Sequence, residues 1–237
     1  MKSALAAFKF LSIARHFDSA QLNPRLVGHG APYFPLVGLI FGLILAIVNR
    51  ALEPLLESEI LGVVLVTLLI VMTGAIHLEG MQKTFDNLSA EANSGNRQSQ
   101  PIGVYGLLAL LLVVLFKIRS VEVIGETRTL SLLLTPVFAR WSLVIFLYGS
   151  TSTADEPTRV IALSVKTWHL LITTAATLLL ATYLAGRTGL WIGLCLSLLA
   201  LLGRSYLHRH RGGLTRDHLG ALIELGETLS FILFASL

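Results

Sequence analysis

Glu79, Lys83 and Asp86 are the residues whose types and spacing most directly suggest chemistry. They stand at positions i, i+4 and i+7, so on a helix their side chains share one face. They follow an apolar run that ends near Ile76, and we expect the helix of that run to continue out of the membrane through them. Carboxylates at such a place can hold Mg²⁺, which favours one or two carboxylates together with waters and substrate phosphates. The spacing predicts a metal-assisted phosphate site or, equally well, a solvated polar helix end, and His77 fits either as a ligand or as an interface residue.

One arginine and two glutamates lie inside apolar segments, where charge is costly. Arg140 stands between an alanine and a tryptophan, and a charged residue within a membrane helix is by default a hypothesis of a functional site. Its guanidinium forms a bidentate fork that suits a phosphate. Glu224 and Glu227 lie three residues apart in the last apolar segment. Arg140 therefore either binds phosphate or pairs with one of these glutamates.

A glycine motif opens the apolar run that begins near residue 102. It reads Pro101-Ile-Gly-Val-Tyr-Gly106, with a proline where helices often begin. The glycines beside Tyr105 either admit a substrate to the backbone or let two helices pack closely.

A second glycine motif precedes the last apolar run and reads Gly212-Gly-Leu-Thr-Arg-Asp-His-Leu-Gly-Ala221. Thr215 in this motif is suited to cap the helix that follows. The basic cluster Arg204–Arg211 comes directly before it, and we expect this cluster to attract an anionic substrate or anionic lipid head groups.

The composition is that of a membrane protein. Of the 237 residues 54% are hydrophobic and 14% are charged, against about 25% charged residues in soluble domains. A helix needs roughly 20 apolar residues to cross a bilayer, and open sheets cannot satisfy their backbone groups in lipid. We predict an all-α polytopic protein, a single integral membrane domain over residues 1–237, with six to seven transmembrane helices. The predicted spans are Phe34–Val48, Ile60–Ile76, Ile102–Ile118, Leu130–Tyr148, Trp168–Leu184, Leu190–Leu202 and Leu219–Leu237.

Two further features limit the class of protein. The single cysteine, Cys195, lies inside an apolar run, which excludes a disulfide framework. The first fifteen residues alternate apolar and basic side chains, so they predict a helix lying in the membrane interface or an ordinary tethered N-terminus. We expect the lipid bilayer as a partner and no nucleic acid.

The distribution of basic residues predicts the orientation. With seven spans and a cytoplasmic N-terminus, the cytoplasmic side carries more than twice as many basic residues as the other side. The two sets are Lys2, Lys9, Arg15, Arg25, Lys83, Arg97, Arg159, Lys166, Arg204, Arg209, Arg211 and Arg216, against Arg50, Lys117, Arg119, Arg128 and Arg187. The positive-inside rule favours this arrangement, which places both polar motifs in the cytoplasm, where nucleotide-activated substrates are found.

Four segments in the same order resemble the cobalamin synthase family, the adenosylcobinamide-GDP ribazoletransferases. Tyr33–Gly42 is similar to the family's first membrane segment, and Met72–Gly80 is similar to its M-T-G-G-x-H-L-D-G. Ile102–Gly106 resembles I-G-T-x-G, and Gly212–Ala221 resembles G-G-x-T-G-D-x-L-G-A. The resemblance covers most of the chain.

The resemblance implies an activity and a set of site residues. The family joins α-ribazole, or its phosphate, to adenosylcobinamide-GDP and releases GMP with Mg²⁺, in the inner membrane of a bacterial or archaeal cell. It implies a catalytic role for Glu79, Asp86 and Asp217, with Mg²⁺ held by Glu79 and Asp86. The substrates would be corrinoid and nucleotide molecules, and a homo-oligomer or membrane complex is an open alternative. The substrate-binding residues that it implies are His77, Asn87, Gly103, Tyr105, Arg140, Thr215 and Glu224.

The chain departs from the family pattern at the positions that carry charge. Glu79, Lys83 and Asp86 stand where the pattern has three aspartates, Arg216 replaces a glycine, and Gln98–Pro101 replaces K-D-S-R. An ammonium between two carboxylates can satisfy both and opposes a divalent cation. Our hypothesis is that Lys83 replaces the charge of the metal. The alternative to the transferase is a catalytically degenerate relative that binds a corrinoid or lipid, or serves as a subunit of a membrane assembly.

Overall fold

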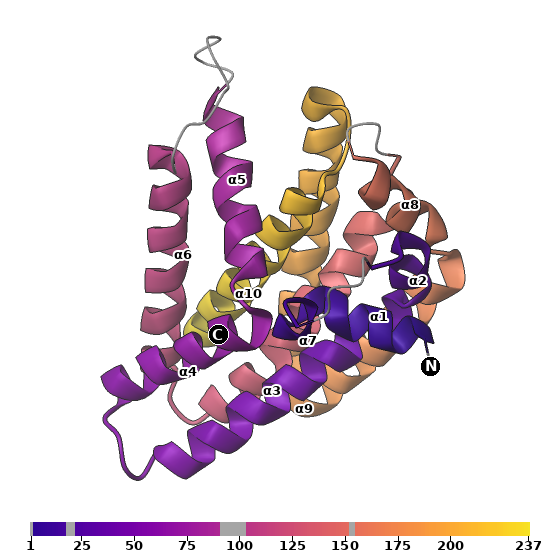
Figure 1. Cartoon of the computed structure of the whole chain (residues 1–237). Helices are drawn as coiled ribbons and strands as arrows, with labels where there is room; N and C mark the ends of the chain where they lie inside the picture. The colour runs from indigo at the N-terminus through magenta and orange to yellow at the C-terminus, as the bar shows by residue number, and fades with distance from the viewer. Residues whose placement is uncertain (1, 18–21, 91–102, 152–154) are drawn as a thin grey trace.

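The computed structural model describes residues 2–17, 22–90, 103–151 and 155–237, and all of its regular elements there are helical. The stretch Gln98–Pro101, where the sequence departs from the family pattern, lies outside the described residues. The helices are α1 Lys2–Leu11, α2 Pro24–His29, α3 Phe34–Leu52, α4 Ser58–Thr73, α5 Ile76–Ala90, α6 Val104–Val123, α7 Arg128–Leu147, α8 Glu156–Ser164, α9 Thr167–Arg211 and α10 Arg216–Ser236 (Figure 1). The predicted all-α membrane fold is confirmed.

Helix α7 forms the centre of the bundle, and nearly all of its residues from Ser131 onward are buried. It contacts α3, α9 and α10. On α3, Gly38 and Gly42 lie one turn apart, and a Cβ atom at either would collide with the α7 backbone at Pro136 or Leu133. Small residues spaced in this way let two membrane helices approach at backbone distance, so α3 and α7 form the most closely packed pair in the core.

Helix α9 is a hairpin. Its residues are helical on both sides of Gly186, which has φ 55° and ψ −130°. A Cβ atom at Gly189 would lie 2.5 Å from the Ala181 carbonyl oxygen, a contact that only two antiparallel arms can make. Both arms of α9 reach Tyr148, whose hydroxyl lies 3.0 Å from Thr167 Oγ1 and whose carbonyl accepts a hydrogen bond from Arg204.

The number of membrane crossings depends on how the broken helices are counted. Five of the described helices are long and apolar enough to cross a bilayer, and the bent pair α4–α5 makes a sixth. The predicted spans Trp168–Leu184 and Leu190–Leu202 are the two arms of the α9 hairpin. Counting these arms separately brings the crossing segments within the described residues to seven, the upper of the two predicted numbers.

The sequence prediction was wrong about the connection between α4 and α5. It expected the helix of the second span to continue out of the membrane through Glu79, but the two axes meet at 88°. The chain turns at Gly74 and Ala75, which have φ values of 63° and 56°. A left-handed conformation costs a non-glycine residue roughly 1–2 kcal/mol, so the neighbouring packing must hold Ala75 in place. Because of this break, α5 starts anew and stands beside α6 and α10 (Figure 1).

Candidate functional site

The two polar motifs meet where α5 crosses α10. A Cβ atom at Gly80 would lie 2.8 Å from the Asp217 carbonyl oxygen, and one at Gly220 would lie 3.0 Å from the His77 carbonyl oxygen. Neither position therefore accepts a larger residue without a shift of backbone. The crossing brings the face of α5 that carries Glu79 and Lys83 beside the first turn of α10.

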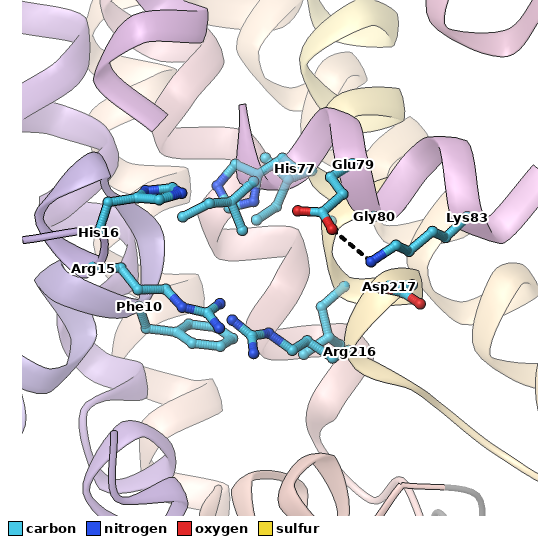
Figure 2. Close-up of a pocket in the computed structure, with 13 residues that line it drawn as sticks. Phe10, Arg15, His16, His77, Glu79, Gly80, Lys83, Arg216 and Asp217 are labelled. Carbon is cyan, nitrogen blue, oxygen red and sulfur yellow. Dashed lines mark hydrogen bonds and ion pairs between the residues drawn. The ribbon is translucent and has the colours of Figure 1, made fainter. Parts of the chain in front are cut away.

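A cavity of about 370 Å³ opens at this crossing. Its ionised side chains are three cations and two carboxylates, and two histidines and several apolar residues complete the wall (Figure 2). The charged side chains come from three separate segments, the 3₁₀ turn Ile13–Arg15, the start of α5 and the start of α10. The lining residues are Phe10, Arg15, His16, Ile76, His77, Glu79, Gly80, Lys83, Arg216, Asp217, Leu219, Gly220 and Ile223.

Glu79 and Lys83 form an ion pair across one turn of α5. Lys83 Nζ lies 2.5 Å from Glu79 Oε1, and both side chains are about half exposed. The side chain of Asp217, in contrast, makes no hydrogen bond or ion pair with any described residue. Asp217 is therefore the carboxylate of the cavity that is available to a ligand.

Two arginines complete the charged wall. Figure 2 shows the guanidinium groups of Arg15 and Arg216 pointing toward one another, and neither is ion-paired within the described part of the chain. Partial burial lowers the pKa of Arg15 below its usual value, and the Glu79 carboxylate opposes this shift. Both groups stay protonated at neutral pH because guanidinium does not titrate there.

His77 forms part of the cavity wall and is otherwise buried, with 4% of its surface exposed. Its Nε2 atom has no hydrogen-bond partner among the described residues. A buried polar atom without a partner is costly, so the packing around His77 must offset this cost.

Asp86 lies away from this cavity, at the start of α6. Its carboxylate accepts hydrogen bonds from the backbone N–H of Gly103 at 2.9 Å, the N–H of Gly106 at 2.7 Å and the amide of Gln82 at 2.5 Å. A Cβ atom at Gly106 would lie 2.5 Å from Asp86 Oδ2. Because Gly103 and Gly106 have no side chains, this carboxylate can reach the backbone N–H groups at the start of α6. The glycines of this motif thus serve close packing between α5 and α6.

The charges inside the apolar segments form a buried cluster of four residues, which we call the core quartet: Lys117, Arg140, Glu224 and Glu227. Lys117 Nζ lies 2.6 Å from Glu224 Oε2 and 2.6 Å from Glu227 Oε2. Arg140 pairs with Glu227 and stacks over the Phe41 ring at 5.2 Å. All four side chains are at most 3% exposed. Of the two alternatives for Arg140, phosphate binding or pairing with a glutamate, the structure thus shows the pairing. Neither Arg140 nor Glu224 lines the cavity.

The remaining sequence-predicted residues have separate locations. Thr215 is the N-cap residue of α10, and its N–H donates to His218 Nδ1 at 3.0 Å. Asn87 is exposed, and its carbonyl accepts a hydrogen bond from Arg211. Tyr105 is 63% exposed near the start of α6, beside Gly103. Their roles in substrate binding stay predictions.

Sequence reasoning missed three residues. Arg15 was predicted only as part of a basic N-terminal interface helix or tether, and nothing was predicted for His16, but both line the cavity. Lys117 was placed on the side of the membrane away from the motifs, but it is 1% exposed and belongs to the core quartet. A usable signal was present for Lys117, since two glutamates in an apolar helix need cations and Arg140 alone cannot neutralise both.

The donor set is a poor match for magnesium held by Glu79 and Asp86. Asp86 is bonded to the α6 amides, and Glu79 is bonded to Lys83. Within the described ranges, no group of three or more His, Cys, Asp or Glu residues could hold a metal ion. Magnesium at these two residues stays a prediction that the partners of both side chains oppose.

The fold and the cavity define a polytopic helical membrane protein with an ionic cavity built from separate helix ends. The chain belongs to the cobalamin-5-phosphate synthase family, whose model matches residues 3–235. A relative from Syntrophobacter fumaroxidans, named adenosylcobinamide-GDP ribazoletransferase, is 32% identical and covers 94% of each chain. Relatives of the same name from Geotalea daltonii and Roseiflexus sp. are 28% and 32% identical over 94% of this chain, and cover 92% and 85% of their own lengths. No solved structure matches the chain significantly.

Proposed function

We propose that this protein is an adenosylcobinamide-GDP ribazoletransferase of cobalamin biosynthesis, acting on a corrinoid nucleotide and α-ribazole or its phosphate. The observation that carries the proposal is the crossing at Gly80 and Gly220, where two of the four family motifs meet and line one cavity. This cavity has an excess of cations and one available carboxylate, which is what transfer at a diphosphate requires.

The reaction divides naturally between these groups. A ribose hydroxyl of α-ribazole attacks the phosphorus that carries the corrinoid side chain, an oxygen–phosphorus bond forms, and the bond to the GMP oxygen breaks. Arg15, Lys83 and Arg216 stabilise the charge on the phosphate oxygens. Asp217 accepts the hydroxyl proton, because Glu79 is already paired with Lys83.

We propose further that the cavity faces the cytoplasm of a cell with an inner membrane. The excess of basic residues on that side of the chain supports this orientation through the positive-inside rule. A cytoplasmic cavity would receive soluble nucleotide substrates directly.

The test is a transfer assay on the full chain in lipid nanodiscs. Purified protein is incubated with adenosylcobinamide-GDP and α-ribazole phosphate, and GMP and the corrinoid product are quantified by chromatography and mass spectrometry. Asp217→Asn should lower kcat by about 10²-fold or more, the usual contribution of a general base. Glu156→Gln, at an exposed position in the first turn of α8, is the matched control and should leave the rate unchanged. Absence of both products from the wild-type protein would reject the transferase.

A further inference from the structure

Three cations from three separate segments line the same cavity, namely Arg15, Lys83 and Arg216. We propose that this cavity binds the diphosphate of its substrate directly through Arg15, Lys83 and Arg216, without a divalent metal ion. The identity of the diphosphate rests on the proposed function, whereas the metal-free anion site rests on the cavity alone.

The balance of charge is the first argument. The cavity holds three cations and two carboxylates, so its net charge is positive. A wall with an excess of cations attracts a phosphate and repels a divalent metal ion.

The arrangement of the arginines is the second argument. The guanidinium groups of Arg15 and Arg216 point toward one another (Figure 2), with no ion-pair partner among the described residues. Two like charges that face each other are unfavourable until an anion lies between them. Guanidinium is also the group that binds phosphate oxygens in a bidentate manner.

The ion pair of α5 is the third argument. Lys83 holds the Glu79 carboxylate at 2.5 Å, so one of the two carboxylates on this wall is already neutralised. Lys83 keeps further N–H donors for a phosphate, since an ammonium has three.

The experiment measures binding of inorganic diphosphate to the full chain in nanodiscs of phosphatidylcholine, by isothermal titration calorimetry. Wild-type protein should bind diphosphate in EDTA, and Mg²⁺ should change its Kd by less than about twofold. The double variant Lys83→Asp/Arg216→Gly should bind about tenfold or more weakly in EDTA, since each lost charged hydrogen bond is worth roughly that factor. Mg²⁺ should restore its binding, which would also show that the variant is folded.

The control variant is Arg187→Asp, which reverses a charge at the exposed α9 turn, outside the cavity. It should bind diphosphate as the wild type does. Nanodiscs that contain anionic phosphatidylglycerol test for a lipid head group as the occupant of the site. Diphosphate affinity should not change in them, and competition by this lipid would overturn the proposal.

A wild-type protein that binds diphosphate only with Mg²⁺ would also overturn the inference, and so would a double variant that binds unaltered in EDTA. These outcomes are independent of the transfer assay. Metal-free binding without transfer would leave the anion site standing and reject the transferase. Transfer by a protein that binds diphosphate only in Mg²⁺ would support the transferase and reject the metal-free anion site.

Discussion

The core quartet and the cavity differ in net charge and in exposure. In the core quartet two cations meet two carboxylates, and every side chain is at most 3% exposed. In the cavity three cations meet two carboxylates, and Glu79 and Lys83 are about half exposed. The first group is neutral and closed, whereas the second is positively charged and open.

This difference separates structural from functional charge within one family fold. A buried charge must be compensated inside the protein, because desolvation would otherwise cost several kcal/mol. An uncompensated charge is tolerable only where water or a ligand can reach it. Arg140, which as a lone arginine in an apolar run suggested a phosphate site, belongs to the first kind, and Arg15 belongs to the second.

Breaking the core quartet should have the largest effect on stability. Lys117→Met leaves Glu224 without its ion-pair partner in the bundle interior, and we expect a loss of about 3–5 kcal/mol. The measurement is thermal unfolding in detergent, together with the folded fraction by size-exclusion chromatography. Lys117→Met/Glu224→Leu removes the pair together and should recover much of that loss. If the single and double variants were equally unstable, charge compensation would not be the reason for the quartet.

Widening the crossing of α5 and α10 should have an intermediate effect and should damage the cavity specifically. Gly80→Ala places a Cβ atom 2.8 Å from the Asp217 carbonyl oxygen, and overpacking of this kind costs about 1–3 kcal/mol. Gly125→Ala is the matched control, because a Cβ atom there meets nothing within 4 Å. Thermal unfolding and diphosphate binding should both decline for Gly80→Ala alone. Unaltered diphosphate binding by Gly80→Ala would contradict the view that this crossing shapes the cavity.

Removing the cavity ion pair should have the smallest effect on stability. Exposed ion pairs contribute about 0–1 kcal/mol, so Lys83→Ala should unfold within that range of the wild type. Its diphosphate affinity should nevertheless fall, since the variant loses a ligand for the anion. A large loss of stability would place Lys83 with the core quartet and erase the contrast between the two regions.

Part of this arrangement is readable from the sequence. Apolar runs locate the spans because a bilayer imposes a minimum helix length, and the two arms of α9 appear as two separate runs. The alternatives for Arg140 include its actual partner. Lys117 is not found in this way, since a lysine near the end of an apolar run looks like a residue at the membrane surface. Its burial depends on Glu224, which is 107 positions away in the sequence.

The cavity is less predictable because it, too, depends on residues that are far apart in the sequence. Glu79 and Lys83 share a helical face, and this spacing is local and readable. Arg15 and Arg216 reach the same wall only because α5 breaks from α4 at Gly74 and then crosses α10. The 88° angle of that break has no periodic signal in the sequence, so the meeting of three distant segments emerges only from the packing.

The turn at Gly186 also decides the sidedness of everything that follows it. Because Thr167 and Arg204 of α9 both reach Tyr148, the hairpin returns the chain to the end of the bundle from which it left. A straight helix of the same 45 residues would instead carry Arg216 and Asp217 to the opposite end of the bundle. The positive φ of Gly186 thus keeps the start of α10 near the start of α5.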